Sequence, residues 1–336
     1  MRAAALVLAS CAVAALSGQD QDTTRLLVSR TVYLMGTRAV LSTHADTRAA
    51  GLATLDSAVV ALEETEAELS TWRDSSAISA LNRQPLGQPW FATPRLCRMF
   101  NDLWMWHQAT NGAFDPAIGR LLDAWDVHGD GRVPSDGAQA TALSLSGLRL
   151  LLFDAGRCTV TRRSDAVIDV GAFGKGEALD RVAAKIGDEP WLIDLGGQIT
   201  VGGRAPQDGA WTVAIADPRQ RDRAAVEVRL AAGSISTSAG SERDLVENGT
   251  RIGHIFDPRT GTSVVFDGSV TVWHARSLAA DALSTALFVM GPEEGLRWSR
   301  TRGLAVLYLI PKDGTLRVEA TPSFRQLISE DVIAPE

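Results

Sequence analysis

The segment from Ile168 to Asp180 contains the residue types that hold an anionic ligand. A short apolar run ends in Asp169, three glycines follow around Lys175, and the chain then becomes helical. Glycines let a backbone approach a phosphate closely, and the N-terminus of a helix favours negative charge. A plain tight turn would also be rich in glycine, so the segment alone leaves both interpretations open.

Two familiar nucleotide-binding motifs do not match this segment. A P-loop needs glycine six positions before the lysine and Ser or Thr after it, but Asp169 and Gly176 stand there. The glycine spacing GxxGxG also differs from the dinucleotide fingerprint GxGxxG. The chain contains no GxSxG, HExxH or CxxC motif, so hydrolase-elbow, zincin and thioredoxin-like chemistry have no support.

The residues from Ser277 to Pro292 predict a buried helix with a single charged side chain, Asp281. Apolar residues surround almost its whole circumference, and Thr285 follows Asp281 by one turn on the same face. Burying a lone carboxylate is costly unless a cation or donors compensate it. Oxygen ligands without a His/Cys cluster favour a hard cation, Mg²⁺ first and Ca²⁺ or Mn²⁺ next. The alternative is an aspartate near the helix start that reaches solvent.

His254 ends a predicted strand just before Asp257-Pro258. A histidine in such a loop is suited to act as a general base near neutral pH. A structural role is the alternative, and the histidine in isolation favours it.

Composition narrows the class of protein. The chain has 336 residues, 45% hydrophobic and 22% charged, which are values of a globular protein with a substantial core. The net charge of −7 argues against nucleic acid as the main partner, because phosphate binding requires a basic surface.

The N-terminus indicates export. Residues 1–17 have the apolar run of a signal peptide and are too short to span a bilayer, which needs about 20 apolar residues. Leu8-Ala9-Ser10-Cys11 also resembles a lipobox, so a lipid anchor on Cys11 and a soluble exported product remain open. Export would place Cys97 and Cys158 in an oxidising compartment, where pairing and free buried thiols are equally open.

The rest of the chain predicts an α+β fold. Residues 18–29 read as a linker, and residues 30–336 as a single catalytic domain of two subdomains. Helices dominate 48–147, with apolar stripes from Arg48 to Leu69 and from Pro94 to Thr110, while short strands dominate 148–330. Sheets packed against helices, with the site between the subdomains, are the expected architecture.

Taken together, these segments resemble the ApbE family, the FAD:protein FMN transferases. The motifs that carry the resemblance occur in one order from residue 35 to the C-terminal part. They are Met35-Gly36-Thr37, Leu69-Ser70-Thr71-Trp72, Thr110-Asn111-Gly112-Ala113-Phe114-Asp115-Pro116, Asp169 to Asp180, Asp194-Leu195-Gly196-Gly197, Thr237-Ser238, His254 to Pro258, and Ala280 to Thr285.

The resemblance implies an ApbE-like (T-fold-like) arrangement with FAD between two subdomains and Mg²⁺ at its pyrophosphate. It assigns the metal to the Ala172 carbonyl and to the side chains of Asp281 and Thr285. It implies His254 as the residue that assists the attacking hydroxyl. The implied flavin contacts are Met35, Trp72, Ala113, Phe114, Asp115, Asp169, Lys175 and Phe256.

The activity implied is Mg²⁺-dependent transfer of FMN from FAD to a threonine of an acceptor redox protein, with release of AMP. The implied acceptor is a membrane-associated redox subunit, and the implied location is the periplasm, with or without the lipid anchor. Two alternatives remain: hydrolysis of FAD to FMN and AMP, and a non-catalytic FAD-binding or flavin-donor protein. Ser284 stands where some members carry a second carboxylate, and Ala239 and Ser241 also depart from the family pattern.

Overall fold

The computed structural model describes residues 25–203, 209–240, 244–247 and 250–328. The predicted signal peptide, the lipobox at Cys11 and residues 18–24 of the predicted linker lie outside the described residues. The first strand, β1, begins at Leu26. Residues 26–29 therefore belong to the sheet, because their backbone pairs with Ser42 to Ala45 rather than running free.

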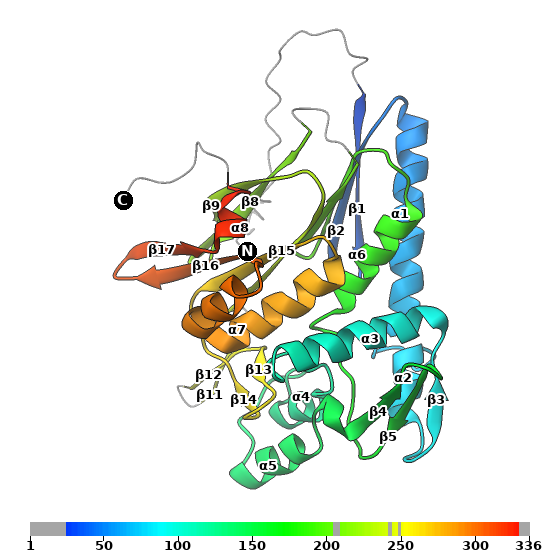
Figure 1. Ribbon diagram of the computed structural model, residues 1–336, viewed down its shortest axis with the longest axis vertical. Helices are drawn as coiled ribbons and strands as arrows, with labels where there is room; N and C mark the ends of the chain where they lie inside the picture. The colour runs from blue at the N-terminus through cyan, green and yellow to red at the C-terminus, as the bar shows by residue number, and fades with distance from the viewer. Residues whose placement is uncertain (1–24, 204–208, 241–243, 248–249, 329–336) are drawn as a thin grey trace, which may run out of the picture.

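An eight-stranded antiparallel sheet runs through the molecule (Figure 1). Each strand pairs with its neighbour in antiparallel register. Its strands, in spatial order, are β1 (Leu26–Leu34), β2 (Thr37–Ala45), β6 (Trp191–Leu195), β7 (Gln198–Gly202), β10 (Gly233–Ala239), β15 (Ser269–His274), β16 (Ala305–Lys312) and β17 (Thr315–Ala320).

Three long helices cover one face of this sheet: α1 (Arg48–Leu69), α6 (Gly174–Lys185) and α7 (Ser277–Arg300). The opposite face carries the hairpin of β8 (Trp211–Asp217) and β9 (Gln220–Leu230) with α8 (Pro322–Arg325). Buried aliphatic side chains fill both interfaces, as a sheet with two covered faces requires.

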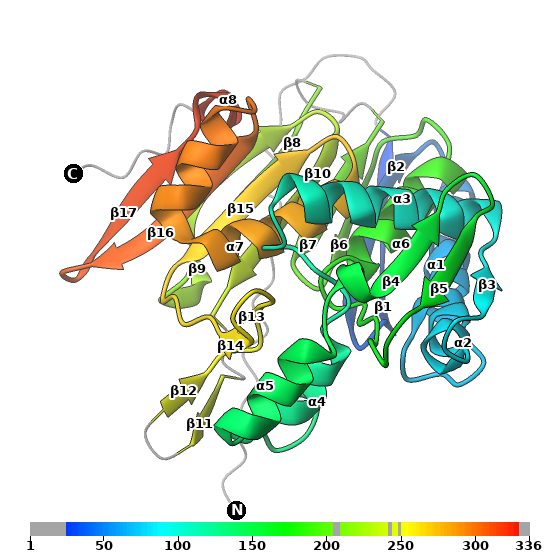
Figure 2. The ribbon, with the colours of Figure 1, turned by 60° about the horizontal axis from the view of Figure 1, so that its bottom comes forward.

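A smaller helical unit packs against the α6 and α7 side (Figure 2). Its fully buried rings include Phe100, Phe114 and Phe173. Its elements are α2 (Ala77–Arg83), β3 (Pro89–Phe91), α3 (Pro94–Ala109), α4 (Gly119–Trp125), α5 (Asp136–Ser144), the short 3₁₀ turn η1 (Leu148–Leu150), β4 (Leu151–Asp154) and β5 (Thr159–Arg162). Two small hairpins follow β10, β11 (Leu245–Glu247) with β12 (Thr250–Ile252) and β13 (Phe256–Asp257) with β14 (Thr262–Ser263).

The predicted α+β class, with mixed sheets packed against helices, is confirmed. Thr47 and Thr93 cap the first turns of α1 and α3, so both helices begin where the periodicity places them. The helix predicted from Ser277 to Pro292 ends at a real break, because Gly291 has a φ of 74° and leaves the helical conformation. A second helical segment follows this kink and extends α7 to Arg300.

Cys97 and Cys158, left open by the sequence, form a disulfide. The bond joins α3 to the start of β5 and closes a chain segment with a sequence separation of 61. In the part of the chain that the structure describes, no helix has the length and apolarity needed to cross a membrane.

α6 and α7 touch at Gly176, where a side chain has no room. A Cβ on Gly176 would lie 2.5 Å from the Ser277 carbonyl oxygen and 2.6 Å from the Leu278 Cα. Both obstacles are backbone atoms, which cannot rotate away as the end of a side chain can. Glycine at this position therefore sets the distance between the two helices.

We expect Gly176→Ala to lower the free energy of unfolding by about 2 kcal/mol, because the added methyl group forces the helices apart. Thermal or urea unfolding followed by circular dichroism measures the change. Gly137→Ala in α5 is the matched control, since nothing lies within 4 Å of its added Cβ. Equal stability of the two variants would show that α6 and α7 separate without cost.

Candidate active site

The centre of the candidate site is the Asp281 carboxylate, at the junction of α6 and α7. Asp281 is only 3% exposed. Its Oδ2 accepts a hydrogen bond from the Gly176 amide at 3.0 Å, and its Oδ1 lies 3.3 Å from Lys175 Nζ. The first turn of α6 thus supplies both an N–H donor and a cation, which compensate the burial of the charge.

Asp180, on α6, binds the N-terminus of α7 in the same way. Its Oδ1 accepts from the Ser277 amide at 2.5 Å and its Oδ2 from the Leu278 amide at 3.3 Å. Arg276, the residue that precedes α7, makes no side-chain cap of its own. The carboxylate from α6 therefore caps α7, while the carboxylate from α7 binds the start of α6.

A group of hydroxyls surrounds Asp281. The Ser236 hydroxyl lies 3.4 Å from Asp281 Oδ1 and 3.1 Å from the Ser284 hydroxyl, which Ser238 also approaches at 3.0 Å. The Thr285 hydroxyl donates to the Asp281 carbonyl at 3.3 Å and is half-buried. Carboxylate and hydroxyl oxygens therefore gather on one side of α7.

These oxygens are suited to a hard cation. Among the described residues, no group of three or more His, Cys, Asp or Glu side chains is placed to hold a metal ion. A metal here would have to combine the single carboxylate with hydroxyl and carbonyl oxygens, which is the ligand type that Mg²⁺ and Ca²⁺ accept. Asp281 and Thr285 fit that requirement, and Ala172 lies in the half-buried turn that leads into α6.

Met35 lies at the same helix start. It occupies the left-handed region, with φ of 53°, and its backbone N–H donates to Glu66 of α1 at 3.0 Å. A Cβ added to Gly174 would meet the Met35 methyl group at 3.7 Å, so the methionine side chain lies over the beginning of α6. Through this hydrogen bond, Glu66 holds the β1–β2 turn that carries Met35.

Trp72, His128 and Asp169 form a connected group next to the glycine-rich turn. Trp72 follows α1 and is 75% exposed, and its ring meets the His128 ring edge-on with centroids 5.2 Å apart. His128 Nε2 lies 3.7 Å from Asp169 Oδ2, and the neighbouring carboxylate raises the pKa of His128. Asp169 Oδ1 accepts from the Gly171 amide at 2.8 Å, so it also shapes the turn.

The Ala113-Phe114-Asp115 turn contributes mainly structure. Ala113 and Phe114 are buried in the core, so their side chains face no ligand and only their backbone could. Asp115 accepts from the Ala117 and Leu148 amides, and burial raises the pKa of Asp115 despite these donors and nearby His107. His107 Nδ1 lies 3.0 Å from the Phe114 carbonyl oxygen, so this histidine helps to hold the turn.

His254 and Phe256 differ in exposure although they are two residues apart. The His254 side chain is 47% exposed and lies 3.6 Å from an Asp244 oxygen. The protein around the ring partly desolvates it and so lowers the pKa of His254, although Asp244 opposes this, and the positive charge of nearby Lys175 lowers the pKa further. Phe256 is only 2% exposed and packs against Trp125, so its ring belongs to the core.

The structure brings Met35, Lys175, Asp281 and Thr285 together around the junction of α6 and α7, with the Asp169 turn leading into it. It places the side chains of Ala113, Phe114 and Phe256 in the core. His128 and Glu66 also contribute contacts at the site, and no local sequence pattern identified them. Of the serines around Asp281, only Ser236 was missed, since Ser238 and Ser284 lie in the motifs that carry the family resemblance.

The ApbE family model matches residues 35–308 of the chain. A protein named FAD:protein FMN transferase from Klebsiella pneumoniae is 30% identical over 272 residues, 77% of each chain. A protein of the same name from Treponema pallidum is 31% identical over 316 residues, 87% of this chain and 86% of the relative.

Solved structures show the same fold. The ApbE protein of Thermotoga maritima superposes with a TM-score of 0.81 at 25% identity, covering 91% of this chain and 100% of that one. The apo form of the flavinyl transferase ApbE of Pseudomonas stutzeri gives 0.79 at 26% identity, covering 92% and 98%.

We expect Mg²⁺ to raise the midpoint of thermal unfolding of the wild-type protein, because an ion held at Asp281 would bind the folded state and not the unfolded chain. Asp281→Asn should abolish this shift, since the amide has no charge for the ion. Asp188→Asn, at an exposed position outside the site, is the matched control and should keep it. An undiminished shift in Asp281→Asn would remove Asp281 from the metal site.

Proposed function

The chain belongs to the ApbE family, and from this premise we propose that it transfers FMN from FAD to an acceptor protein. The observation that carries the proposal is the buried Asp281 carboxylate between Lys175 and the first turn of α6. A helix N-terminus with a lysine and a carboxylate suited to a cation fits a pyrophosphate. FAD carries that group between its FMN and AMP halves.

The reaction forms one bond and breaks another. The hydroxyl oxygen of an acceptor threonine attacks the FMN-side phosphorus, the pyrophosphate P–O bond breaks, and AMP leaves. When bound at Asp281 and Thr285, with the Ala172 carbonyl, Mg²⁺ would neutralise charge on the pyrophosphate oxygens. Lys175 adds a positive charge on the same side, and the rest of the catalysis is positioning.

The flavin ring has a candidate platform in Trp72. Its 75% exposed indole offers a planar face, and His128 holds it edge-on from the side of Asp169. Aromatic faces suit planar ligands, so Trp72 orients the isoalloxazine while Met35 contacts it from the β1–β2 turn. The backbone of the Ala113-Phe114-Asp115 turn completes the contacts.

His254 is the proposed proton acceptor. Its lowered pKa keeps the imidazole neutral at pH 7, so a ring nitrogen can take the threonine proton. Asp244, 3.6 Å away, would stabilise the imidazolium that forms. The exposure of His254 suits an attacking group that arrives on another protein.

The same exposure supports a second activity. Water that reaches His254 could replace the threonine hydroxyl, and FAD would then be hydrolysed to FMN and AMP. Release of AMP in the absence of any acceptor measures this activity directly.

We place the protein outside the cytoplasm, in the periplasm, with a membrane-associated redox subunit as acceptor. The disulfide between Cys97 and Cys158 supports an oxidising compartment. The N-terminal apolar run supports export, with Cys11 as the candidate lipid anchor.

Incubation with FAD, Mg²⁺ and a candidate acceptor should attach fluorescent flavin to the acceptor, visible in a denaturing gel, with one AMP released per flavin transferred. An acceptor with the threonine replaced by valine is the control, because it lacks the attacking oxygen. Absence of covalent flavin on an acceptor that an established transferase labels would overturn the proposal. Tight, intact FAD under these conditions would instead indicate a flavin-binding protein.

We expect His254→Ala to slow transfer by about 10²-fold or more while the Kd for FAD changes much less, because the imidazole acts on the acceptor hydroxyl. In the wild type the rate should fall only at a pH below the ordinary histidine pKa of about 6.5, because the pKa of His254 is lowered and the ring stays neutral further into the acidic range. The variant should lack this decline. Equal losses of transfer and FAD affinity would argue against a base.

A further inference from the structure

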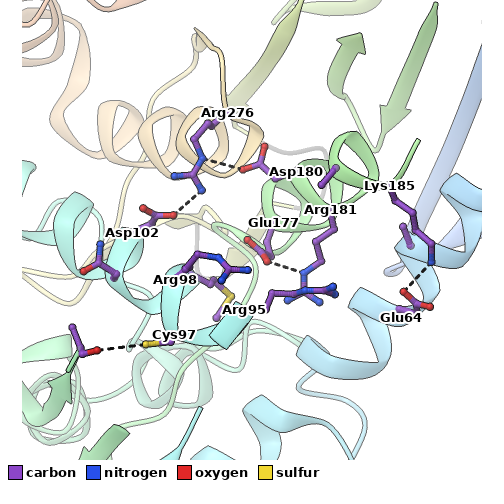
Figure 3. Close-up of a pocket in the computed structure, with 15 residues that line it drawn as sticks. Glu64, Arg95, Cys97, Arg98, Asp102, Glu177, Asp180, Arg181, Lys185 and Arg276 are labelled. Atoms are coloured by element: carbon purple, nitrogen blue, oxygen red, sulfur yellow. Dashed lines mark hydrogen bonds and ion pairs between the residues drawn. The ribbon is translucent and has the colours of Figure 1, made fainter. Parts of the chain in front are cut away.

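A cleft of about 910 Å³ lies between α1, α3, α6 and the start of α7 (Figure 3). Charged side chains dominate its lining, so we name it the arginine cleft. Its cations are Arg95, Arg98, Arg181, Lys185 and Arg276, and its carboxylates are Glu64, Asp102, Glu177 and Asp180. The cleft has the volume of a small-molecule site.

The arginine cleft is distinct from the flavin site. Five residues of α6 line it: Glu177, Asp180, Arg181, Ala184 and Lys185. An α-helix has about 3.6 residues per turn, so the first four project from the side of α6 opposite to Lys175. Lys175 faces Asp281, and neither residue lines the cleft. One helix therefore separates the two sites.

Arg181 is the buried cation of the cleft, with 8% of its surface exposed. Its Nε donates to Glu177 at 2.7 Å and its Nη1 to Glu68 at 2.5 Å. Its Nη2 is also buried, and within the described part of the chain it has no hydrogen-bond partner. A guanidinium N–H without an acceptor in the interior costs free energy. An acceptor that reached Arg181 Nη2 would therefore stabilise the folded protein.

Arg95 and Arg98 add two positive charges from neighbouring turns of α3. Both are exposed, and in the described ranges no ion pair or hydrogen bond of either guanidinium occurs. Like charges three residues apart on a helix repel each other, so this pair destabilises the empty protein slightly. By contrast, Arg276 is paired with Asp102 at 2.6 Å and Asp180 at 3.6 Å.

We infer that the arginine cleft binds a small dianion, a phosphate compound or a dicarboxylate, through Arg95, Arg98 and the Nη2 group of Arg181. Guanidinium groups bind the oxygens of both anions through two parallel hydrogen bonds. The dianion satisfies the Arg181 donor and neutralises the unpaired arginines of α3. This inference does not depend on the proposed flavin transfer.

Isothermal titration calorimetry of the whole protein with inorganic phosphate, and separately with succinate, tests the inference in a chloride buffer with EDTA and without FAD. We expect one site per chain for at least one of the two anions. Arg95→Gln/Arg98→Gln should weaken binding at least about tenfold, because two charge-assisted contacts are lost. The anion that binds distinguishes phosphate compounds from dicarboxylates.

Three variants test whether the anion binds in the arginine cleft and not elsewhere on the protein. Arg163→Gln removes an exposed arginine outside the cleft and should bind as the wild type does. Lys175→Gln should also bind normally, which excludes the flavin site as the place where phosphate binds. The double variant should unfold at the wild-type temperature or above it, since it loses only repulsion. Absence of binding by both anions, equal binding in the double variant, or loss of binding in Lys175→Gln would overturn the inference.

Discussion

The candidate site depends on an exchange of carboxylates between two helices. Asp180 of α6 caps the amides of Ser277 and Leu278, and Asp281 of α7 accepts from the amide of Gly176. Each helix end thus receives a negative charge from the other helix, where its unsatisfied N–H groups and its dipole favour one. Because Gly176 lacks a side chain, the backbones approach closely enough for both contacts.

This exchange explains how a fold built on a large sheet can hold a buried charge. The sheet and the helical unit bury α7 almost completely, which would normally exclude a carboxylate. The start of α6 supplies the compensating amide and Lys175. Thr285, one turn further along α7, is only half-buried, and the Lys175 side chain that faces Asp281 is 30% exposed.

The buried charge on α7 and the family could be predicted because both depend on local sequence patterns. An apolar helix with one charge predicts a buried Asp281 that needs compensation, and ordered motifs predict the family. Contacts between distant segments leave no local pattern, so the edge contact of His128 with Trp72 and the amide bound by Glu66 were not predicted. For Phe114 and Phe256 the motifs identified the residues but not the direction of their side chains. Both rings were expected at the flavin, and both lie in the core.

The Gly176–Asp281 contact spans 105 positions of the chain. The two partners of this contact meet only when the chain folds, because α6 and α7 lie far apart along it. Until α7 packs against α6, Lys175 has no Asp281 to face and Asp180 has no helix to cap. The ligand site therefore forms at the folding step that joins these two helices.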